Sequence, residues 1–298
     1  MNIDRTRRNK IKVVAGIRLS LLVACFWPML VAAQQIVSYP RPESDSDSRA
    51  SYPLALLTSC AQRSKKEFAL VPSEFRAQQG RNIRELALGK GLDVLWAVTT
   101  EEREQLLLPI RIPIDRGLIG WRLLLIRNQD ENLFSAISSR EQLAALRAGQ
   151  GHDWPDLDVL RSNNFTVSTS TNYEGLFQML ALGHIQYFPR AVTEIWPEME
   201  KHRSMGIGVA QTLAIHYPQA LYFFVNKSNT MLANALTSCL NAMTLDGTLQ
   251  ALIYQFYGDA IQRAQLDRRT IIEVSNPSLP ANTPSLQSIY WYSPKRSS

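Results

Sequence analysis

Residues 92–103 read LDVLWAVTTEER, and this stretch determines the fold class that we predict. Residues 92–98 form a nearly continuous apolar run with one Asp, which is typical of a strand buried on both faces of a sheet. Thr99 and Glu102 have the spacing of a capping box, so a helix should begin directly after the strand. A buried strand that leads into a helix indicates an α/β protein.

The same alternation of strand and helix patterns continues on both sides of this stretch, which supports the α/β class. Further strands are expected at residues 36–39, 68–71, 121–126, 165–169, 185–188 and 271–274. Helices are expected at residues 52–61, 78–88, 173–182, 228–243 and 248–264.

Two more capping boxes predict helix starts in the middle of the chain. Ser138 and Glu141 predict a helix that ends at Gly149. Thr171 and Glu174 predict the start of the helix that follows the strand at 165–169.

Two extended segments that contain glycines, residues 111–120 and 206–217, bracket a central block. This arrangement predicts one lobe inserted into another, with both connections crossing at one hinge. The expected boundaries are 34–116 and 212–298 for a discontinuous lobe 1, and 117–211 for the inserted lobe 2. The pattern alone also allows a single three-layer α/β domain whose long strands contain glycine.

The first 33 residues have the layout of a secretory signal peptide. A basic segment precedes an apolar run at residues 19–31, and Val31-Ala32-Ala33 forms a small-residue cleavage site. We therefore expect cleavage after Ala33 and export to the periplasm. A membrane anchor and a lipoprotein cleavage site before Cys25 are the alternatives, although the apolar run continues past Cys25.

Removal of this segment changes the charge of the chain. The full sequence holds 32 Lys and Arg against 26 Asp and Glu. Residues 1–33 contain six of the basic residues and one acidic residue, so the remainder has 26 basic and 25 acidic residues and a formal charge of +1. The basic isoelectric point therefore reflects the targeting segment, and we expect no nucleic-acid partner.

Motifs for enzymatic chemistry are missing from the sequence. It has no Gly-x-Ser-x-Gly elbow, no His-Glu-x-x-His pair, no phosphate-binding glycine loop and no dinucleotide fingerprint. The four histidines lie at no metal-ligand spacing. We therefore expect no cofactor, no metal and no catalysis.

Ten stretches, taken in order and spacing, resemble the family 3 extracellular solute-binding proteins, which include polar amino-acid receptors. The stretches are residues 79–86, 92–103, 108–110, 117–122, 154–156, 177–180, 187–190, 217–218, 222–225 and 246–247. The resemblance covers roughly all of the chain after residue 33. It implies the type II periplasmic-binding fold, in which two α/β lobes joined by two crossing strands close on a ligand in the cleft.

The resemblance also implies a function. Proteins of this family usually deliver a small solute to an ABC importer, so we expect a monomer that binds a small anionic or amino-acid-like ligand. Some members instead serve membrane sensors. A third alternative is an enzyme similar to the cyclohexadienyl dehydratases, which share the fold, with Glu194 as the acid.

Arg103 is the first candidate ligand residue. The resemblance implies that a Thr-rich turn followed by Arg, here Thr99, Thr100 and Arg103, binds the α-carboxylate of the ligand. The physics agrees, because free amides at a helix start attract anions and a guanidinium matches a carboxylate with two parallel hydrogen bonds. A surface Arg neutralised by Glu101 or Glu102 is the alternative.

In lobe 2, the candidates are Thr169, Ser170 and Thr171, whose hydroxyls could hold an anion or could only cap a helix. Arg190 stands where the amino-acid receptors usually have an acid that pairs with the ligand ammonium, although Glu194 is nearby. This difference favours a dianion or an aromatic acid over a simple amino acid.

Tyr39 and Trp96 follow or lie in strands and could stack on a ligand, although aromatic side chains at such places more often belong to the core. Cys60 and Cys239 fall on helices of lobe 1. If those helices touch, an oxidising periplasm would join the two cysteines; otherwise they are buried free thiols.

Overall fold

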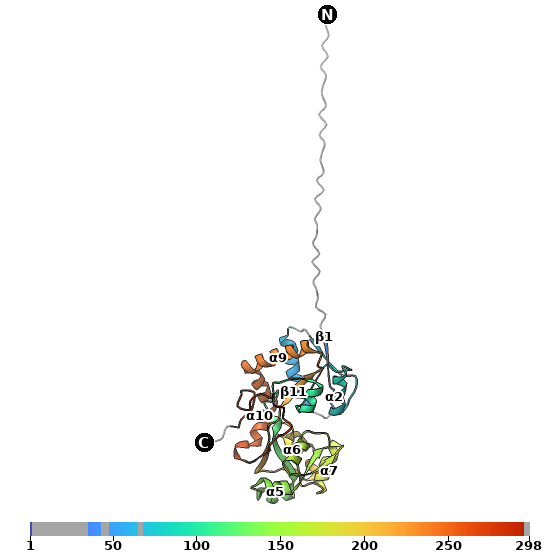
Figure 1. Ribbon diagram of the computed structural model, residues 1–298. Coiled ribbons are helices and arrows are strands. Elements are labelled where there is room, and N and C mark those ends of the chain that lie inside the picture. The colour runs from blue at the N-terminus through green and yellow to red at the C-terminus, as the bar shows by residue number, and fades with distance from the viewer. Residues whose placement is uncertain (2–34, 43–47, 65–67, 295–298) are drawn as a thin grey trace. The chain divides into compact units, whose positions relative to one another are not determined.

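The computed structural model describes Met1 and residues 35–42, 48–64 and 68–294. The predicted signal peptide and its cleavage site lie outside this part of the chain. Residues 34–298 form one compact unit. Within this unit the strands gather into the sheets of two lobes (Figure 1).

The sheet of lobe 1 consists of a parallel pair of strands and an antiparallel triplet that one aspartate connects. The strands are β1 (Gln35–Tyr39), β2 (Phe68–Pro72), β3 (Val94–Val98), β4 (Leu108–Ile110) and β11 (Leu221–Val225). The backbone N–H of Asp93 donates to Ser38 O at 3.0 Å, and its Oδ2 accepts from Ser38 N at 2.8 Å. β1-β2 and β3-β11-β4 are separate hydrogen-bonded ladders, and the bonds between Asp93 and Ser38 place β1 beside β3, so the strands of lobe 1 lie side by side in the order β2-β1-β3-β11-β4.

Helices cover both faces of this sheet. They are α1 (Ser51–Arg63), α2 (Gln79–Ala87), α3 (Glu101–Leu106), α9 (Thr230–Leu245) and α10 (Thr248–Ala264). Along β11, Phe223 packs with α1 and α9, whereas Tyr222 and Phe224 pack with α2. The strands are therefore apolar on both faces, as the run at residues 92–98 predicts.

Lobe 2 contains a seven-stranded sheet in the order β12-β10-β5-β8-β6-β7, with β9 also paired to β5. The strands are β5 (Trp121–Arg127), β6 (Arg147–Gly151), β7 (Thr166–Ser170), β8 (Tyr187–Ala191), β9 (Ile207–Val209), β10 (Leu213–His216) and β12 (Thr270–Glu273). Its helices are α4 (Glu131–Ser135), α5 (Arg140–Ala145), α6 (Asp156–Ser162), α7 (Tyr173–Ala181) and α8 (Ile195–Lys201). In Figure 1 the label of α5 marks lobe 2 and that of α9 marks lobe 1.

β5 is the central strand of lobe 2 and is buried on both faces. Leu124 and Ile126 pack in a core with α5 and α6, and Leu123 and Leu125 pack in a second core with α7 and α8. Full burial of each of these side chains stabilises the fold by about 1.5–3 kcal/mol.

The lobe boundary differs from the expected one after residue 211. β10 pairs with β5 and with β12, so both late strands belong to the sheet of lobe 2. The end of α10 reaches the same lobe, because Ala264 packs in the core with α7 and α8. Strand pairing between distant segments, which local patterns do not reveal, decides this boundary.

Two expected helix starts are displaced. The capping box before α5 uses Ser139 and Gln142, and α5 ends at Ala145 because the chain then enters β6. Gly149 lies in β6, where a Cβ would collide with Ile185.

Helix α7 is capped by Asn172, whose Oδ1 accepts from Gly175 N at 3.3 Å, and not by Thr171. Asn, Ser and Thr are all good N-cap residues, so when they are neighbours the sequence does not determine which of them caps the helix.

Two segments, residues 111–120 and 217–220, connect the sheets of the two lobes. The second segment differs from the expected 206–217, because β9 and β10 occupy most of that range and pair with β5 in lobe 2. These hinge segments touch closely, because a Cβ on Gly120 would collide with the carbonyl oxygen of Tyr217. Gly117 has φ +75°, a left-handed conformation that glycine adopts without strain. Asp115 fastens this turn, since its carboxylate accepts from Gly117 N at 2.9 Å and from Ile119 N at 2.7 Å.

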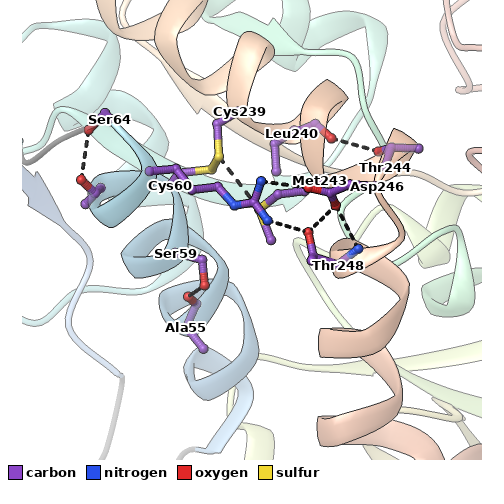
Figure 2. The surroundings of a disulfide bond; sticks show 12 residues. Ala55, Ser59, Cys60, Ser64, Cys239, Leu240, Met243, Thr244, Asp246 and Thr248 are labelled. Carbon is purple, nitrogen blue, oxygen red and sulfur yellow. Dashed lines mark hydrogen bonds and ion pairs between the residues drawn. A yellow bond between two sulfur atoms is a disulfide. The ribbon is translucent and has the colours of Figure 1, made fainter.

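Cys60 on α1 and Cys239 on α9 form a disulfide bond with an S–S distance of 2.05 Å (Figure 2). Close by, Arg63 Nη1 lies 2.8 Å from Asp246 Oδ2, and its Nη2 donates to Thr248 Oγ1 at 2.8 Å. The disulfide therefore links two helices of lobe 1 through cysteines that are 179 residues apart in the chain.

Candidate functional site

The candidate site lies where the carboxyl ends of strands from the two lobes meet. In lobe 1, β3 leads into the turn before Arg103. In lobe 2, β6, β7 and β8 run parallel, so the loops after Gly151, Ser170 and Ala191 emerge at the same edge. Open α/β sheets bind their ligands outside such ends.

Arg103 lies in the first turn of α3 and is almost fully buried, with 9% of its surface exposed. Thr100 caps the helix, because its Oγ1 accepts from Arg103 N at 3.2 Å. The guanidinium donates to Val98 O at 2.7 Å through Nη1 and to Gln79 Oε1 at 2.8 Å through Nη2. The side chain is thus held in one orientation by lobe 1.

Arg103 interacts electrostatically with carboxylates of lobe 2. Burial lowers the pKa of Arg103 to about 10, although the carboxylates of Asp153, Asp156 and Glu102 act in the opposite direction. Asp153 and Asp156 come from the loop after β6 and the start of α6. The main charges that lobe 2 presents to Arg103 are therefore negative.

Thr99 and Thr100 both have structural partners. Thr99 is 1% exposed, and its Oγ1 donates to Glu104 Oε1 at 2.7 Å. Its backbone N–H donates to Ala220 O of the second hinge segment at 2.9 Å. Thr100, and not Thr99, caps α3. The contribution of these threonines to ligand binding stays a prediction.

Arg190 is placed differently from the expectation of a second arginine that faces a ligand. It is 2% exposed, and its Nε and Nη2 each donate to a carboxylate oxygen of Glu198 at 2.7 Å. Its Nη2 also lies 2.9 Å from Glu194 Oε2. Burial alone lowers the pKa of Arg190. The carboxylates of Glu194 and Glu198 raise this pKa by more than burial lowers it, so the net pKa lies well above the ordinary value.

Aromatic rings enclose the same guanidinium. The Arg190 Cζ atom lies 4.8 Å from the ring centroid of Trp154, 5.1 Å from that of Phe188 and 5.8 Å from that of Tyr173. The Tyr173 hydroxyl donates to Glu198 Oε1 at 2.6 Å. With its charge neutralised and its faces covered, Arg190 supports the loops of lobe 2, and its expected contact with a ligand stays a prediction.

A second buried arginine extends this network to the hinge. Arg122 Nη2 lies 2.6 Å from Asp156 Oδ1 and 2.7 Å from Gln219 Oε1, and Arg122 Nη1 lies 3.7 Å from Glu194 Oε2. The Tyr217 hydroxyl also donates to Asp156. We call Arg122, Asp156, Arg190, Glu194 and Glu198 the buried ion-pair network. It holds three carboxylates and two guanidinium groups.

The two lobes are in contact at this site. Asp153 Oδ2 lies 3.9 Å from the place where a Cβ on Gly80, at the start of α2, would be. Arg49 of lobe 1 lies over the ring of Tyr173 of lobe 2, 5.3 Å from its centroid. Two hollows of about 460 and 320 Å³ lie in lobe 1, and neither includes Arg103. The first is lined by side chains from residues 88–93 and 226–229, and the second by Tyr39 with side chains of α1 and β2. In this arrangement of the lobes only 9% of the Arg103 surface is exposed.

The remaining candidates lie around this site or away from it. Ser170 Oγ accepts from Asn172 N at 3.0 Å in the turn before α7, and Thr169 and Thr171 are exposed. Tyr39 and Trp96 are half-buried against the core of lobe 1, so their expected stacking on a ligand stays a prediction.

Asp153, Asp156 and Arg122 were not among the site residues predicted from the sequence. Asp156 falls in one of the stretches that carry the resemblance, but no local pattern marks Asp153 or Asp156 as a charge that acts on Arg103. Arg122 is one polar residue in an apolar strand, a signal that indicates a buried charge and its partner.

The described ranges contain no group of three or more His, Cys, Asp or Glu side chains arranged to hold a metal ion. In the same ranges, every helix is too short or too polar to span a lipid bilayer.

No protein-family model and no curated protein matches the chain. Solved structures match it in three dimensions. An ancestral arginine-binding protein bound to arginine has a TM-score of 0.58 and 15% identity, over 75% of this chain and 98% of the other. A histidine kinase sensor domain with similarity to periplasmic binding proteins has a TM-score of 0.56 and 14% identity, over 76% and 96%.

A third match is an ancestral amino acid-binding protein described as a precursor of cyclohexadienyl dehydratase. It has a TM-score of 0.53 and 14% identity, over 75% of this chain and 95% of the other. Identities this low show the fold alone. The chain has the two-lobed type II periplasmic-binding fold, which excludes the single three-layer domain.

Proposed function

We propose that the chain is a periplasmic solute-binding protein that closes on an amino-acid-like ligand between its lobes and delivers it to an ABC importer. The observation that carries the proposal is the orientation of Arg103 by Val98 O and Gln79 Oε1 at the start of α3, opposite carboxylates of lobe 2. Its guanidinium would bind the ligand carboxylate.

The lobe 2 groups favour an amino acid over a dianion. Arg190 is neutralised within the buried ion-pair network, whereas Asp153 has 36% of its side chain exposed and an electrostatic effect on Arg103. Asp153 and the partly exposed Glu194 would accept a ligand ammonium. A ligand that bridges the lobes stabilises the closed arrangement in proportion to its preference for that arrangement.

The network also argues against the enzyme alternative. Glu194 Oε2 lies 2.9 Å from Arg190 Nη2 and 3.7 Å from Arg122 Nη1. The Glu194 carboxylate is thus held by two guanidinium groups within lobe 2.

The first test is a thermal-shift screen of residues 34–298 against amino acids, dicarboxylates and aromatic acids, followed by calorimetry. A ligand that binds only the folded protein raises the melting temperature. Arg103→Ala should weaken binding by roughly 10- to 100-fold, the value of a charge-assisted hydrogen bond. Arg140→Ala, which removes a half-exposed arginine of α5, is the matched control. Unchanged affinity in Arg103→Ala would refute the site.

Asp153→Asn separates the two ligand classes. An amino-acid-like ligand should lose affinity because its ammonium loses a carboxylate partner, whereas a dianion should bind more tightly. Once a ligand is known, lost uptake in a strain that lacks the protein would support import. Normal uptake with a lost signalling response would support the sensor alternative.

A further inference from the structure

The segment that follows β12 is polar and rich in proline, and it packs along the hinge. We call residues 275–292 the C-terminal strap. It starts on lobe 2, where Ser275 N donates to Asn163 Oδ1 at 3.2 Å and Asn163 Nδ2 donates to Ser275 O at 2.8 Å.

The strap then binds both segments that cross the hinge. Asn276 Nδ2 donates to Pro218 O of the second segment at 2.8 Å. On the first segment, Tyr292 N donates to Arg116 O at 2.6 Å and Arg116 Nη2 donates to Trp291 O at 2.9 Å.

Trp291 lies directly against the left-handed turn of the hinge. A Cβ on Gly117 would lie 2.6 Å from Trp291 Cζ3, so the indole fills the space that a side chain would occupy. The indole N–H donates to Pro284 O at 3.1 Å within the strap, and the ring packs against the core of lobe 1 on the α2 side.

Two tyrosines complete the attachment. The Tyr290 hydroxyl donates to Asn241 Oδ1 of α9 at 3.0 Å, which anchors the strap on lobe 1. Tyr292 packs against cores of both lobes and meets Trp121 edge-to-face with ring centroids 6.5 Å apart. The strap therefore connects lobe 2, both hinge segments and lobe 1 by contacts at each of them.

These contacts are made while the lobes touch, with Asp153 against Gly80 and Arg49 over Tyr173. A strap bound to both hinge segments opposes any separation of the lobes that turns these segments relative to each other. Prolines at 277, 280 and 284 restrict the free strap and reduce the entropy lost when it is ordered.

We propose that the C-terminal strap restrains opening of the hinge and thereby sets the fraction of molecules in which the lobes are in contact. The effect on lobe opening is independent of any ligand. A further consequence rests on the proposed function: the apparent affinity for a ligand that needs the closed arrangement scales with the closed fraction.

The test measures the distance between the lobes. Residues 34–298 carry spin labels at Lys90→Cys of lobe 1 and His184→Cys of lobe 2, two exposed positions, while the native cysteines are held in the disulfide. In this background Trp291→Ala should broaden the pulsed-EPR distance distribution and add longer distances. Ile289→Ala, in the same strap but 58% exposed, is the control and should keep the parent distribution.

Tyr290→Phe removes only the hydroxyl that binds Asn241 and provides a milder second variant. If Trp291→Ala fails to fold, added longer distances in Tyr290→Phe support the strap and a parent distribution overturns it. If Trp291→Ala folds with the parent distribution, the proposal is wrong. The distances need no ligand, so failure of the proposed function would leave this result intact.

Discussion

The role of Glu198 in holding Arg190 leads to the most direct prediction from the buried ion-pair network. Glu198 is 7% exposed, accepts two hydrogen bonds of 2.7 Å from Arg190 and receives a third, of 2.6 Å, from Tyr173. Glu198→Gln removes the charge but keeps the volume, so Arg190 stays buried with Glu194 as its remaining carboxylate partner.

The expected cost follows from these contacts. Removal of one partner of a buried ion pair destabilises proteins by about 3–5 kcal/mol, and the remaining Glu194 places this case near 3 kcal/mol. For a chain of this length, each kcal/mol lowers the melting temperature by about 2–4 °C. The melting temperature of Glu198→Gln should therefore fall by roughly 6–12 °C.

The assay is thermal unfolding followed by circular dichroism at pH 7, with Glu200→Gln as the control. Glu200 lies two residues away, has 47% of its side chain exposed, and lies 3.6 Å from Arg203 and 3.9 Å from Arg263. Its loss should change stability by less than about 0.5 kcal/mol. Equal melting temperatures for the two variants would refute the internal role of Arg190 and restore it as a candidate for ligand binding.

Two further predictions concern the hinge and the disulfide. Burial raises the pKa of Asp115 to about 7, so the contribution of Asp115 to stability is fully present below about pH 4 and is lost as the pH rises through 7. Relative to Asp115→Asn, the free energy of unfolding should fall by up to about 4 kcal/mol between pH 4 and 8. Urea unfolding that shows the same difference between the two proteins at every pH would contradict this prediction. Reduction of Cys60–Cys239, which closes a loop of 179 residues, should lower stability by up to about 5 kcal/mol; unchanged melting of a fully reduced and alkylated sample would contradict this.

The fold could be predicted from the sequence because its signals are local. The apolar run at 92–98 and the helices at 228–243 and 248–264 correspond closely to β3, α9 and α10. Arg103 is also at a helix start, as expected, because a strand end and a capping threonine are adjacent in the chain.

Errors arose where distant segments decide the structure. The helix expected up to Gly149 ends earlier because residues 147–151 pair with β7 and β8. Residues 213–216 and 270–273 join lobe 2 by pairing that no local pattern reveals.

The sequence by itself determined the α/β class, the two-lobed interpretation through the resemblance, and the position of Arg103, since each depends on neighbours along the chain. Only the tertiary structure decided that Arg190 is neutralised and that the C-terminal strap lies on the hinge. Whether a charged side chain meets a ligand or a carboxylate depends on which segments converge around it, and that convergence is set by the packing of the whole fold.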